Sequence, residues 1–231
     1  MSINVQNLSV SYGTKKALDN FSYDFREGKV YVVLGPNGCG KSTLVKAIVD
    51  KFAKGDISYV AQETLGVINL LVSEYIELGR YNPKKFFGGL SSYDKGKVEN
   101  AIDVMNLSEF KDRMFDTLSG GEKQRVMAAR AFAQDAKWTI LDEPSSNLDV
   151  KHTSLIMNTV KKQCEEEGKS FIIVLHDIND ATKYADVILL MKEGKLIKST
   201  DRLTTNDLKE VFDSDFGCVK SSDGRELFYA L

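Results

Sequence analysis

Hydrophobic residues follow two patterns along this chain, and the patterns predict two kinds of β-strand. Near the N-terminus, apolar and polar positions alternate over residues 3–12 and again over residues 21–25, which predicts antiparallel strands with one buried face. Residues 30–34 form instead an unbroken apolar run, which is typical of a strand covered on both faces. Further apolar runs occur at residues 57–61, 138–141, 171–175 and 187–191.

Helical segments separate these apolar runs and indicate an α/β fold. The sequence predicts helices over residues 41–52, 121–134 and 150–167, so strands and helices alternate as they do in a parallel sheet. Between about residues 72 and 107 the chain is polar and helical. We therefore expect a parallel-sheet core, an N-terminal antiparallel β lobe and an inserted helical sub-lobe.

Net charge, cysteine spacing and the length of the apolar runs limit the kinds of partner that this chain is expected to bind directly. The 231 residues carry a formal net charge of -2, so no overall basic field attracts nucleic acid or anionic lipid, although a local basic patch stays possible. The three cysteines are far apart and lack the spacing of metal ligands, which predicts reduced thiols in a cytosolic protein. We find no signal-peptide pattern and no apolar run of the roughly 18 residues that a membrane span needs. Any contact with a membrane is therefore expected to pass through a partner.

The segment directly after the apolar run 30–34 is a candidate phosphate loop. It matches the pattern G-x-x-x-x-G-K-[ST] and is followed by a helical segment, which is the strand–loop–helix context that this motif requires. Its backbone amides are expected to surround phosphates, with Lys41 at the β- and γ-oxygens and Ser42 as a ligand of Mg²⁺. The alternative is a glycine-rich turn without a ligand. The candidate binding residues are Gly35, Asn37, Gly38, Cys39, Gly40, Lys41, Ser42 and Thr43.

The ends of two apolar runs supply candidate catalytic side chains. Asp142 and Glu143 follow one run, and adjacent residues of an extended chain point apart. Asp142 is therefore expected near Mg²⁺ and Glu143 near the attacking water, the alternative being a plain acid pair at a strand end. His176 follows another run and is expected at the same sheet edge, as a γ-phosphate contact, with a surface or core histidine as the alternative. His152, in a helical segment, is interpreted as structural.

Residues 118–122, Leu-Ser-Gly-Gly-Glu, form a second candidate anion site. Two consecutive glycines that open a helix leave backbone N–H groups pointing outward at the positive end of the helix dipole. However, the segment has no lysine equivalent to Lys41 and no hydroxyl equivalent to Ser42 to hold a metal. It has the character of half a site that needs a partner.

Together these motifs resemble the ATP-binding cassette (ABC) ATPases, and the resemblance extends over nearly the whole chain. The segment 118–122, followed by Lys-Gln-Arg, is a signature found almost only in that family. The resemblance implies ATP and Mg²⁺ as ligands and ATP hydrolysis as the reaction. It also implies a head-to-tail dimer of two copies, in which ATP lies between the phosphate loop of one chain and Ser119, Gly120 and Gly121 of the other.

The resemblance also assigns roles to residues outside these motifs. Tyr12 corresponds to an aromatic residue that stacks on adenine, although a buried strand tyrosine is the alternative. Gln62 corresponds to a glutamine that contacts Mg²⁺ or the lytic water and links the site to the helical lobe. Residues 145–149, which end in Asp149, correspond to a loop that crosses the dimer interface.

One ABC ATPase domain over residues 1–231 is the domain organisation that the resemblance implies. Residues 1–62 and 118–231 would form the core with the antiparallel lobe, and residues from about 63 to 117 the helical sub-lobe. The chain departs from the family between Phe52 and Ile57, where a segment that normally carries another strand is missing. The antiparallel lobe is therefore expected to be reduced.

Several segments are similar to importer ATPases for iron-siderophore, haem and cobalamin-type substrates. They are Cys39, residues 78–81, 149–152 and 174–186, and a tail with a helix after Leu203 and a closing hairpin around Asp223. The leading hypothesis is an ATP-hydrolysing importer subunit at the cytoplasmic face of the membrane, working with an integral membrane permease and indirectly with a substrate-binding protein.

Three other functions are the alternatives to this hypothesis. One is the ATPase of another ABC importer or exporter. Another is a soluble ABC ATPase acting on DNA or ribosomes, although no nucleic-acid partner is expected because the chain has neither a long coiled coil nor a second cassette. The third is a non-hydrolysing regulatory cassette, against which Glu143 and His176 argue.

Overall fold

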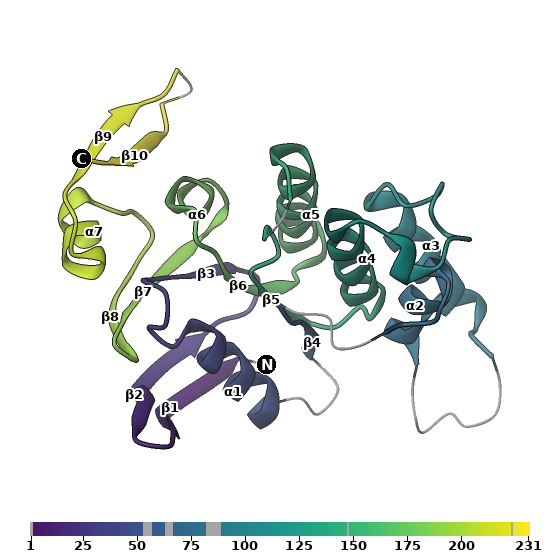
Figure 1. Ribbon diagram of the computed structural model, residues 1–231, viewed down its shortest axis with the longest axis horizontal. Helices are drawn as coiled ribbons and strands as arrows, with labels where there is room; N and C mark the ends of the chain where they lie inside the picture. The colour runs from purple at the N-terminus through teal and green to yellow at the C-terminus, as the bar shows by residue number, and fades with distance from the viewer. Residues whose placement is uncertain (1, 53–56, 63–66, 82–88, 147, 223) are drawn as a thin grey trace. The chain divides into compact units, whose positions relative to one another are not determined.

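The computed structural model describes residues 2–52, 57–62, 67–81, 89–146, 148–222 and 224–231 (Figure 1). Within this part of the chain, the protein divides into two compact units. The first unit comprises residues 1–54 and 161–231, and the second comprises residues 55–160. The sequence also predicts turns at residues 82–83 and 88–89. Residues 82–88 fall outside the described residues, as do the shortened segment 53–56, Asn147 and the predicted hairpin tip at Asp223.

The first unit begins with the antiparallel strands β1 (Ile3–Tyr12) and β2 (Lys15–Phe25), as the alternating pattern predicts. The alternation contains one three-residue step, from Val5 to Leu8, and the register of the pair shifts there. Asn7 lies within this irregularity and has a left-handed backbone, with a φ of 49°. This bulge keeps Val5 and Leu8 on one face of the ribbon.

Four further strands of the first unit form a sheet in the order β6 (Ser170–Val174), β3 (Val30–Leu34), β7 (Val187–Lys192), β8 (Lys195–Thr200). β3 is parallel to β6 and to β7, and all residues of β3 and β6 are buried, which confirms the prediction from continuous apolar runs. The sequence pattern does not predict β8, because this antiparallel edge strand is polar and mostly exposed. The turn before it has Glu193 and Gly194 at φ values of 49° and 77°, as two-residue hairpins prefer.

The remaining elements of the first unit are helices and one hairpin. α1 (Lys41–Phe52) has the predicted bounds. The C-terminal part contains α6 (Ile178–Tyr184), α7 (Thr205–Phe212) and the antiparallel pair β9 (Phe216–Lys220) and β10 (Glu226–Ala230). The Asn179 side chain of α6 donates to Phe228 O at 3.1 Å and accepts from Phe228 N at 2.8 Å. These two hydrogen bonds hold α6 and the hairpin together.

The second unit contains the parallel strands β4 (Ile57–Val60) and β5 (Trp138–Asp142) together with a group of helices. The helices are α2 (Val72–Glu77), η1 (Leu78–Arg80), α3 (Ser92–Val104), η2 (Phe115–Thr117), α4 (Gly120–Ala133) and the first part of α5 (Val150–Glu167). α4 packs against α2 and α3 and is buried over most of its length (Figure 1). The polar, helical segment that the sequence predicts between about residues 72 and 107 therefore corresponds to α2, η1 and α3, which pack against α4.

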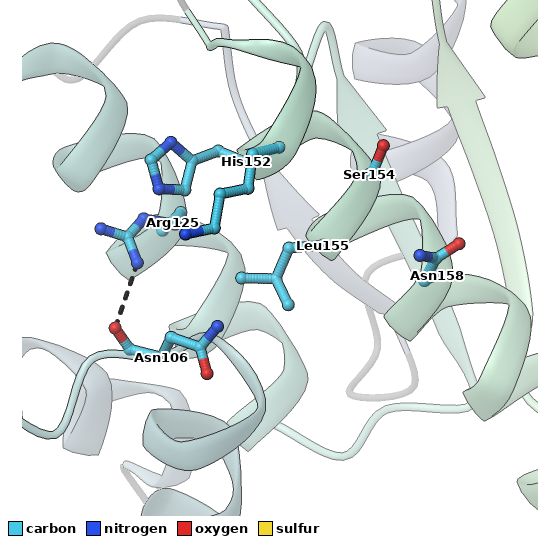
Figure 2. A pocket seen from close by; sticks show the side chains of 7 residues that line it. Asn106, Arg125, His152, Ser154, Leu155 and Asn158 are labelled. Carbon is cyan, nitrogen blue, oxygen red and sulfur yellow. Dashed lines mark hydrogen bonds between the residues drawn. The ribbon is translucent and has the colours of Figure 1, made fainter.

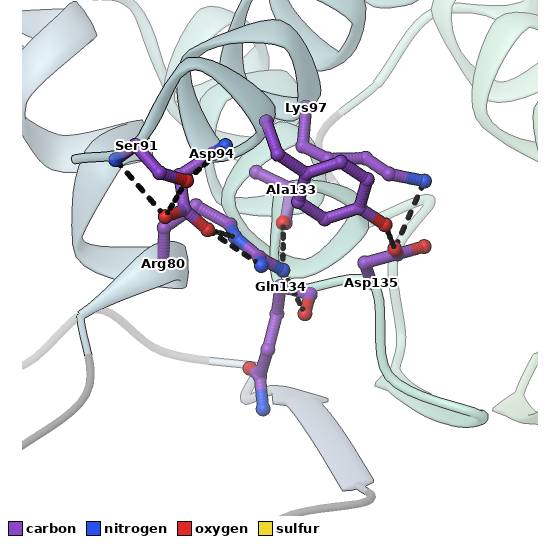
Figure 3. Close-up of polar contacts among 8 residues, drawn as sticks. Arg80, Ser91, Asp94, Lys97, Ala133, Gln134 and Asp135 are labelled. Atoms are coloured by element: carbon purple, nitrogen blue, oxygen red, sulfur yellow. Dashed lines mark hydrogen bonds and ion pairs between the residues drawn. The ribbon is translucent and has the colours of Figure 1, made fainter. Parts of the chain in front are cut away.

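A guanidinium group joins the helices of the second unit at the C-terminal end of α4 (Figure 3). Arg80 donates to Asp94 Oδ1 from Nε at 2.8 Å and from Nη2 at 2.7 Å. Its Nη1 donates to the carbonyl of Ala133, the last residue of α4, at 3.3 Å and to that of the C-cap Gln134 at 2.8 Å. Gly79 precedes it because a Cβ at that position would lie 2.3 Å from Arg130 O. The pair Gly79-Arg80 thus lets η1 approach α4 closely and satisfy its terminal carbonyls.

Acid is expected to destabilise the second unit through Asp94. Hydrogen bonds from Ser91 and Arg80 lower the pKa of Asp94 to about 2. Because an aspartate of an unfolded chain has a pKa of about 3.9, this stabilisation is present above about pH 4 and is lost as the pH falls toward 2. Asp94→Asn should therefore lower the thermal unfolding midpoint at neutral pH, yet show a smaller further fall between about pH 4 and pH 2.

The control for this acid profile is Asp112→Asn, at an exposed aspartate of the same unit. It should follow the wild-type dependence on pH. Parallel curves for Asp94→Asn and the wild type would contradict the assignment of the acid effect to Asp94.

Candidate functional site

The candidate phosphate loop of the first unit is held by backbone contacts that admit only glycine at two positions. Gly35 and Gly40 have φ values of 156° and 107°. A Cβ on Gly35 would lie 2.1 Å from Met191 O in β7, and one on Gly40 would lie 2.3 Å from Ala17 O in β2. The loop backbone therefore lies directly against β2 and β7.

Gly40→Ala is expected to lower the free energy of unfolding by about 2 kcal/mol or more, because the strained φ and the contact with Ala17 both penalise a side chain. Gly13→Ala is the matched control. Gly13 also has a positive φ, 59°, but a Cβ there would meet nothing within 4 Å, so its cost should stay near about 1 kcal/mol. Denaturant unfolding followed by circular dichroism measures both, and equal losses would show that the contact with Ala17 is not what requires glycine.

Lys41 opens α1 and turns its ammonium group into the loop. The residue is 5% exposed, and its Nζ donates to Gly35 O at 2.8 Å and to Pro36 O at 3.1 Å. The loop thus combines a cation with the N-terminus of a 12-residue helix, whose dipole favours an anion. Burial raises the pKa of the Cys39 thiol, so this residue adds no negative charge to the loop at neutral pH.

His176 lies at the same sheet edge as the phosphate loop. In the parallel pair of β3 and β6, Val33 lies opposite Val174, and Leu175 N donates to Val33 O at 3.3 Å. The loop begins directly after β3, and His176 follows the end of β6 by two residues. His176 is exposed, so it is not a core histidine. The sheet of the first unit therefore brings these two sequence features together.

Tyr12 and Lys15 flank the turn between β1 and β2. Tyr12 is 61% exposed, so its interpretation as a buried strand residue is wrong. Lys15 pairs with Tyr12 across the strands, and its Nζ lies 4.0 Å from a Cβ built on Gly38. A second ammonium group therefore lies beside the phosphate loop. Lys15 is not identified from the sequence alone, although Gly13 signals the tight turn that returns the chain to this position.

In the second unit, the ends of β4 and β5 bring Gln62 and Glu143 together. The strands are parallel, and Gln62 Nε2 donates to Glu143 Oε2 at 2.6 Å. The adjacent carboxylates differ in their surroundings, since Asp142 is fully buried and Glu143 is partly exposed. Glu143 also has a φ of 54°. Such a conformation is uncommon for residues other than glycine and clusters at functional sites.

The glycine pair 120–121 opens α4 behind a capping box. Ser119 Oγ accepts from Glu122 N at 3.3 Å, and Glu122 Oε2 accepts from Ser119 N at 2.7 Å. The hydrogen bond from the Ser119 backbone lowers the pKa of Glu122. A Cβ on Gly120 would meet nothing within 4 Å. Folding therefore does not require glycine at position 120, and the segment presents the N–H groups of the first helical turn.

The segment after Glu143 leads into α5. Ser146 donates to Glu143 O from its N at 3.1 Å and from its Oγ at 2.9 Å. Asp149 Oδ1 accepts from His152 N at 2.8 Å and lies 3.0 Å from His152 Nδ1. Asp149 therefore serves as an N-terminal cap of α5, and His152 has a structural contact with it.

Oxygen ligands suited to Mg²⁺ occur among the candidate residues. They are the Ser42 hydroxyl in the first unit, and the Gln62 amide and the Asp142 carboxylate in the second. A single carboxylate with neutral oxygens fits Mg²⁺, which is usually held by one or two carboxylates, water and substrate phosphates.

In the described part of the chain, no helix is both long and apolar enough to cross a membrane.

Comparisons with known proteins agree with these features. Residues 18–146 match the ABC transporter family. The petrobactin import ATP-binding protein YclP of Bacillus subtilis (strain 168) is 34% identical over 236 aligned positions, covering 91% of this chain and 92% of that protein. A chain from a metal-chelate type ABC transporter in an inward-facing conformation has a TM-score of 0.84 at 25% identity, with 99% of this chain and 96% of that chain covered. The dimeric bacterial ABC transporter cassette MJ0796 has a TM-score of 0.77 at 26% identity, with 88% of this chain and 100% of that chain covered. The chain therefore belongs to the ABC transporter family, as an ATP-binding subunit.

Proposed function

We propose that this chain is the ATP-hydrolysing subunit of an ABC importer that takes up an iron chelate or a related metal complex through a separate membrane permease. The observation that carries the proposal is the loop 35–43, whose glycine backbone packs against β2 and β7 around the Lys41 ammonium group. A loop of this construction binds nucleotide phosphates. The similarity to a petrobactin import subunit and to a metal-chelate type transporter supports the class of cargo.

ATP would be bound mainly by residues of the first unit. Lys41 would contact the β- and γ-phosphate oxygens, and the exposed ring of Tyr12 would stack on adenine. The ion Mg²⁺, when bound, supplies charge neutralisation at the phosphates. Ser42, Gln62 and Asp142 would hold it. The loop residues whose backbone or side chains would surround the phosphates are Gly35, Asn37, Gly38, Cys39, Gly40 and Thr43.

Hydrolysis would depend on three side chains. Glu143 would orient the attacking water and accept its proton. Gln62 would hold the Glu143 carboxylate, to which it already donates at 2.6 Å. His176 would donate to the γ-phosphate from the edge of the sheet, where β6 ends beside β3. The left-handed backbone of Glu143 supports this assignment, because strain of this kind is retained where function needs it.

A second copy of the chain would complete the site. Residues Ser119, Gly120 and Gly121 offer backbone N–H groups at the N-terminus of α4 but no cation of their own. In a head-to-tail dimer they would contact the phosphates held by the loop of the partner copy, and Asp149 would lie at the interface. The likeness to a dimeric cassette supports this arrangement.

The partner driven by ATP binding and hydrolysis would be an integral membrane permease. The chain, one ABC ATPase domain, would attach to this permease at the cytoplasmic face of the membrane. A substrate-binding protein would deliver the cargo to the permease and would have no direct contact with this chain. ATP binding would close the dimer, and hydrolysis with product release would reopen it, so that the permease alternates between two states.

The experiment that tests this function starts from the tagged chain purified out of detergent-solubilised membranes. We expect an integral membrane protein to co-purify, and ATP hydrolysis by the reconstituted complex to rise when a ferric chelate and its binding protein are supplied. A rate indifferent to every metal chelate tested would contradict the cargo class. Co-purification with ribosomes or DNA instead of a membrane protein would contradict the transport function itself.

A further inference from the structure

The turn between β1 and β2 places Lys15 opposite Tyr12. Two residues, Gly13 and Thr14, separate the strands, and Gly13 has a φ of 59°, as glycine has in tight two-residue hairpin loops. Tyr12 and Lys15 form a cross-strand pair, so their side chains lie on the same face of the ribbon. The exposed Tyr12 side chain and the Lys15 side chain are therefore neighbours.

The start of β2 packs directly on the phosphate loop. A Cβ on Gly40 would lie 2.3 Å from Ala17 O and 3.1 Å from Leu18 Cδ2. Lys15 belongs to the same stretch of β2, and its Nζ lies 4.0 Å from a Cβ built on Gly38. The packing of the strand on the loop therefore sets the position of Lys15, without a bond from its own side chain.

Other cations beside the candidate motifs differ from Lys15 because they hold parts of the protein. Lys41 donates to two carbonyls of the loop, at 2.8 and 3.1 Å. Arg125, just after the glycine segment 118–122, donates from Nη1 to Asn106 O at 3.1 Å (Figure 2). The exposed Lys15 side chain has neither a hydrogen bond nor an ion pair within the residues that the structure describes. Its ammonium group is therefore available to a ligand of the loop.

The acidic residue nearest to Lys15 in the sequence is already bound by two other lysines. Asp19 of β2 lies 2.5 Å from Lys16 Nζ and 3.3 Å from Lys195 Nζ. Lys16 follows Lys15 in the strand, and successive side chains of a strand point to opposite faces. The charge of Lys16 is thus directed away from the loop and paired, whereas the charge of Lys15 is directed toward the loop.

We propose that Lys15 is a further nucleotide-binding residue, whose ammonium group contacts the α- and β-phosphates of ATP. This inference rests on the proposed function, in which adenine stacks on Tyr12 and the terminal phosphates lie at the loop. A nucleotide bound in this way extends from Tyr12 to the loop, and Lys15 lies beside both Tyr12 and Gly38. Lys15 would form a charge-assisted contact on the adenine side of the phosphate chain, while Lys41 contacts the other end.

Titration calorimetry of the full chain with Lys15→Gln tests this contact. The ligands are ADP and the non-hydrolysable ATP analogue adenylyl imidodiphosphate, each with Mg²⁺. We expect the Kd of both to rise at least about fivefold, and by the same factor, because both nucleotides carry the α- and β-phosphates. Lys15→Arg should keep most of the affinity, since a guanidinium group also binds phosphate. The unfolding midpoint of Lys15→Gln should stay close to that of the wild type, because the side chain is exposed.

Lys16→Gln is the matched control for this titration. It removes the same charge one residue further along β2, on the opposite face of the strand. Asp19 keeps its contact with Lys195 in this variant. The Kd of both nucleotides should therefore remain at the wild-type value.

Three results would overturn the assignment of Lys15. The first is an unchanged Kd for both nucleotides in Lys15→Gln. The second is equal weakening by Lys15→Gln and Lys16→Gln, which would indicate a general effect of positive charge on β2. The third is weaker binding of the ATP analogue alone, which would place the ammonium group at the γ-phosphate. A wild-type chain that binds neither nucleotide would instead contradict the proposed function, and this contact with it, so the two failures are distinguishable.

Discussion

Glu143→Gln is expected to lower the rate of ATP hydrolysis by about 10²–10⁴-fold while leaving ATP binding intact. Glutamine has the shape of glutamate, and its side-chain oxygen can still accept the hydrogen bond that Gln62 donates at 2.6 Å. The substitution therefore keeps the contact between the ends of β4 and β5, but it removes the group that accepts a proton from water. Phosphate release measures turnover, and a fluorescent ATP analogue measures binding.

The same variant should accumulate as an ATP-bound dimer, because closure precedes hydrolysis in the proposed cycle. Size-exclusion chromatography with and without ATP measures this. The matched control is Glu99→Gln at an exposed position of α3, which should leave the rate unchanged. An ordinary rate in Glu143→Gln would remove Glu143 from the chemistry.

Gly120→Asp is expected to lower turnover at least about 100-fold, because it places a carboxylate where the phosphates of the partner's ATP would meet backbone N–H groups. The fold should tolerate the change. A side chain at position 120 meets nothing within 4 Å, and an acidic residue in the first turn of a helix is favourable to the helix dipole. ATP binding by the loop of the same chain should persist, and the unfolding midpoint should stay close to that of the wild type.

Gly96→Asp is the matched control for this experiment. Gly96 lies in α3, and a Cβ there also meets nothing within 4 Å. Because the position is away from the glycine pair 120–121, its substitution should leave turnover unchanged. Full activity in Gly120→Asp, or equal losses in both variants, would argue against a second copy completing the site.

Much of the fold can be predicted from segments whose own pattern of apolar residues identifies them as buried strands or helices. β3, α1 and α5 have the predicted bounds, because an unbroken apolar run or a helical period identifies an element without knowledge of its neighbours. β8 escapes this reasoning, since a polar edge strand has one covered face and little hydrophobic signal. The short helix α6 escapes it too, because seven residues carry too little periodicity.

The candidate site also has features that the local sequence predicts and features that depend on contacts between distant residues. The phosphate loop and the glycine segment 118–122 are readable from the sequence, because each is set by residues a few positions apart. The contact between Gln62 and Glu143 joins residues 81 positions apart, and it depends on β4 and β5 being neighbours. The position of Lys15 beside Gly38 likewise depends on how the β1–β2 turn meets the loop.

The sequence by itself thus identified the candidate chemical groups of this protein, which are a phosphate loop, two unlike carboxylates at a strand end, and a glycine segment for which it predicts a second copy of the chain as partner. Only the tertiary structure decided what surrounds those groups, including the backbone of β2 and β7 against the loop, the Gln62 amide against Glu143 and the left-handed backbone of Glu143. The physical reason is that hydrophobic period and motif spacing record whether a segment is buried. They do not record which distant segment buries it.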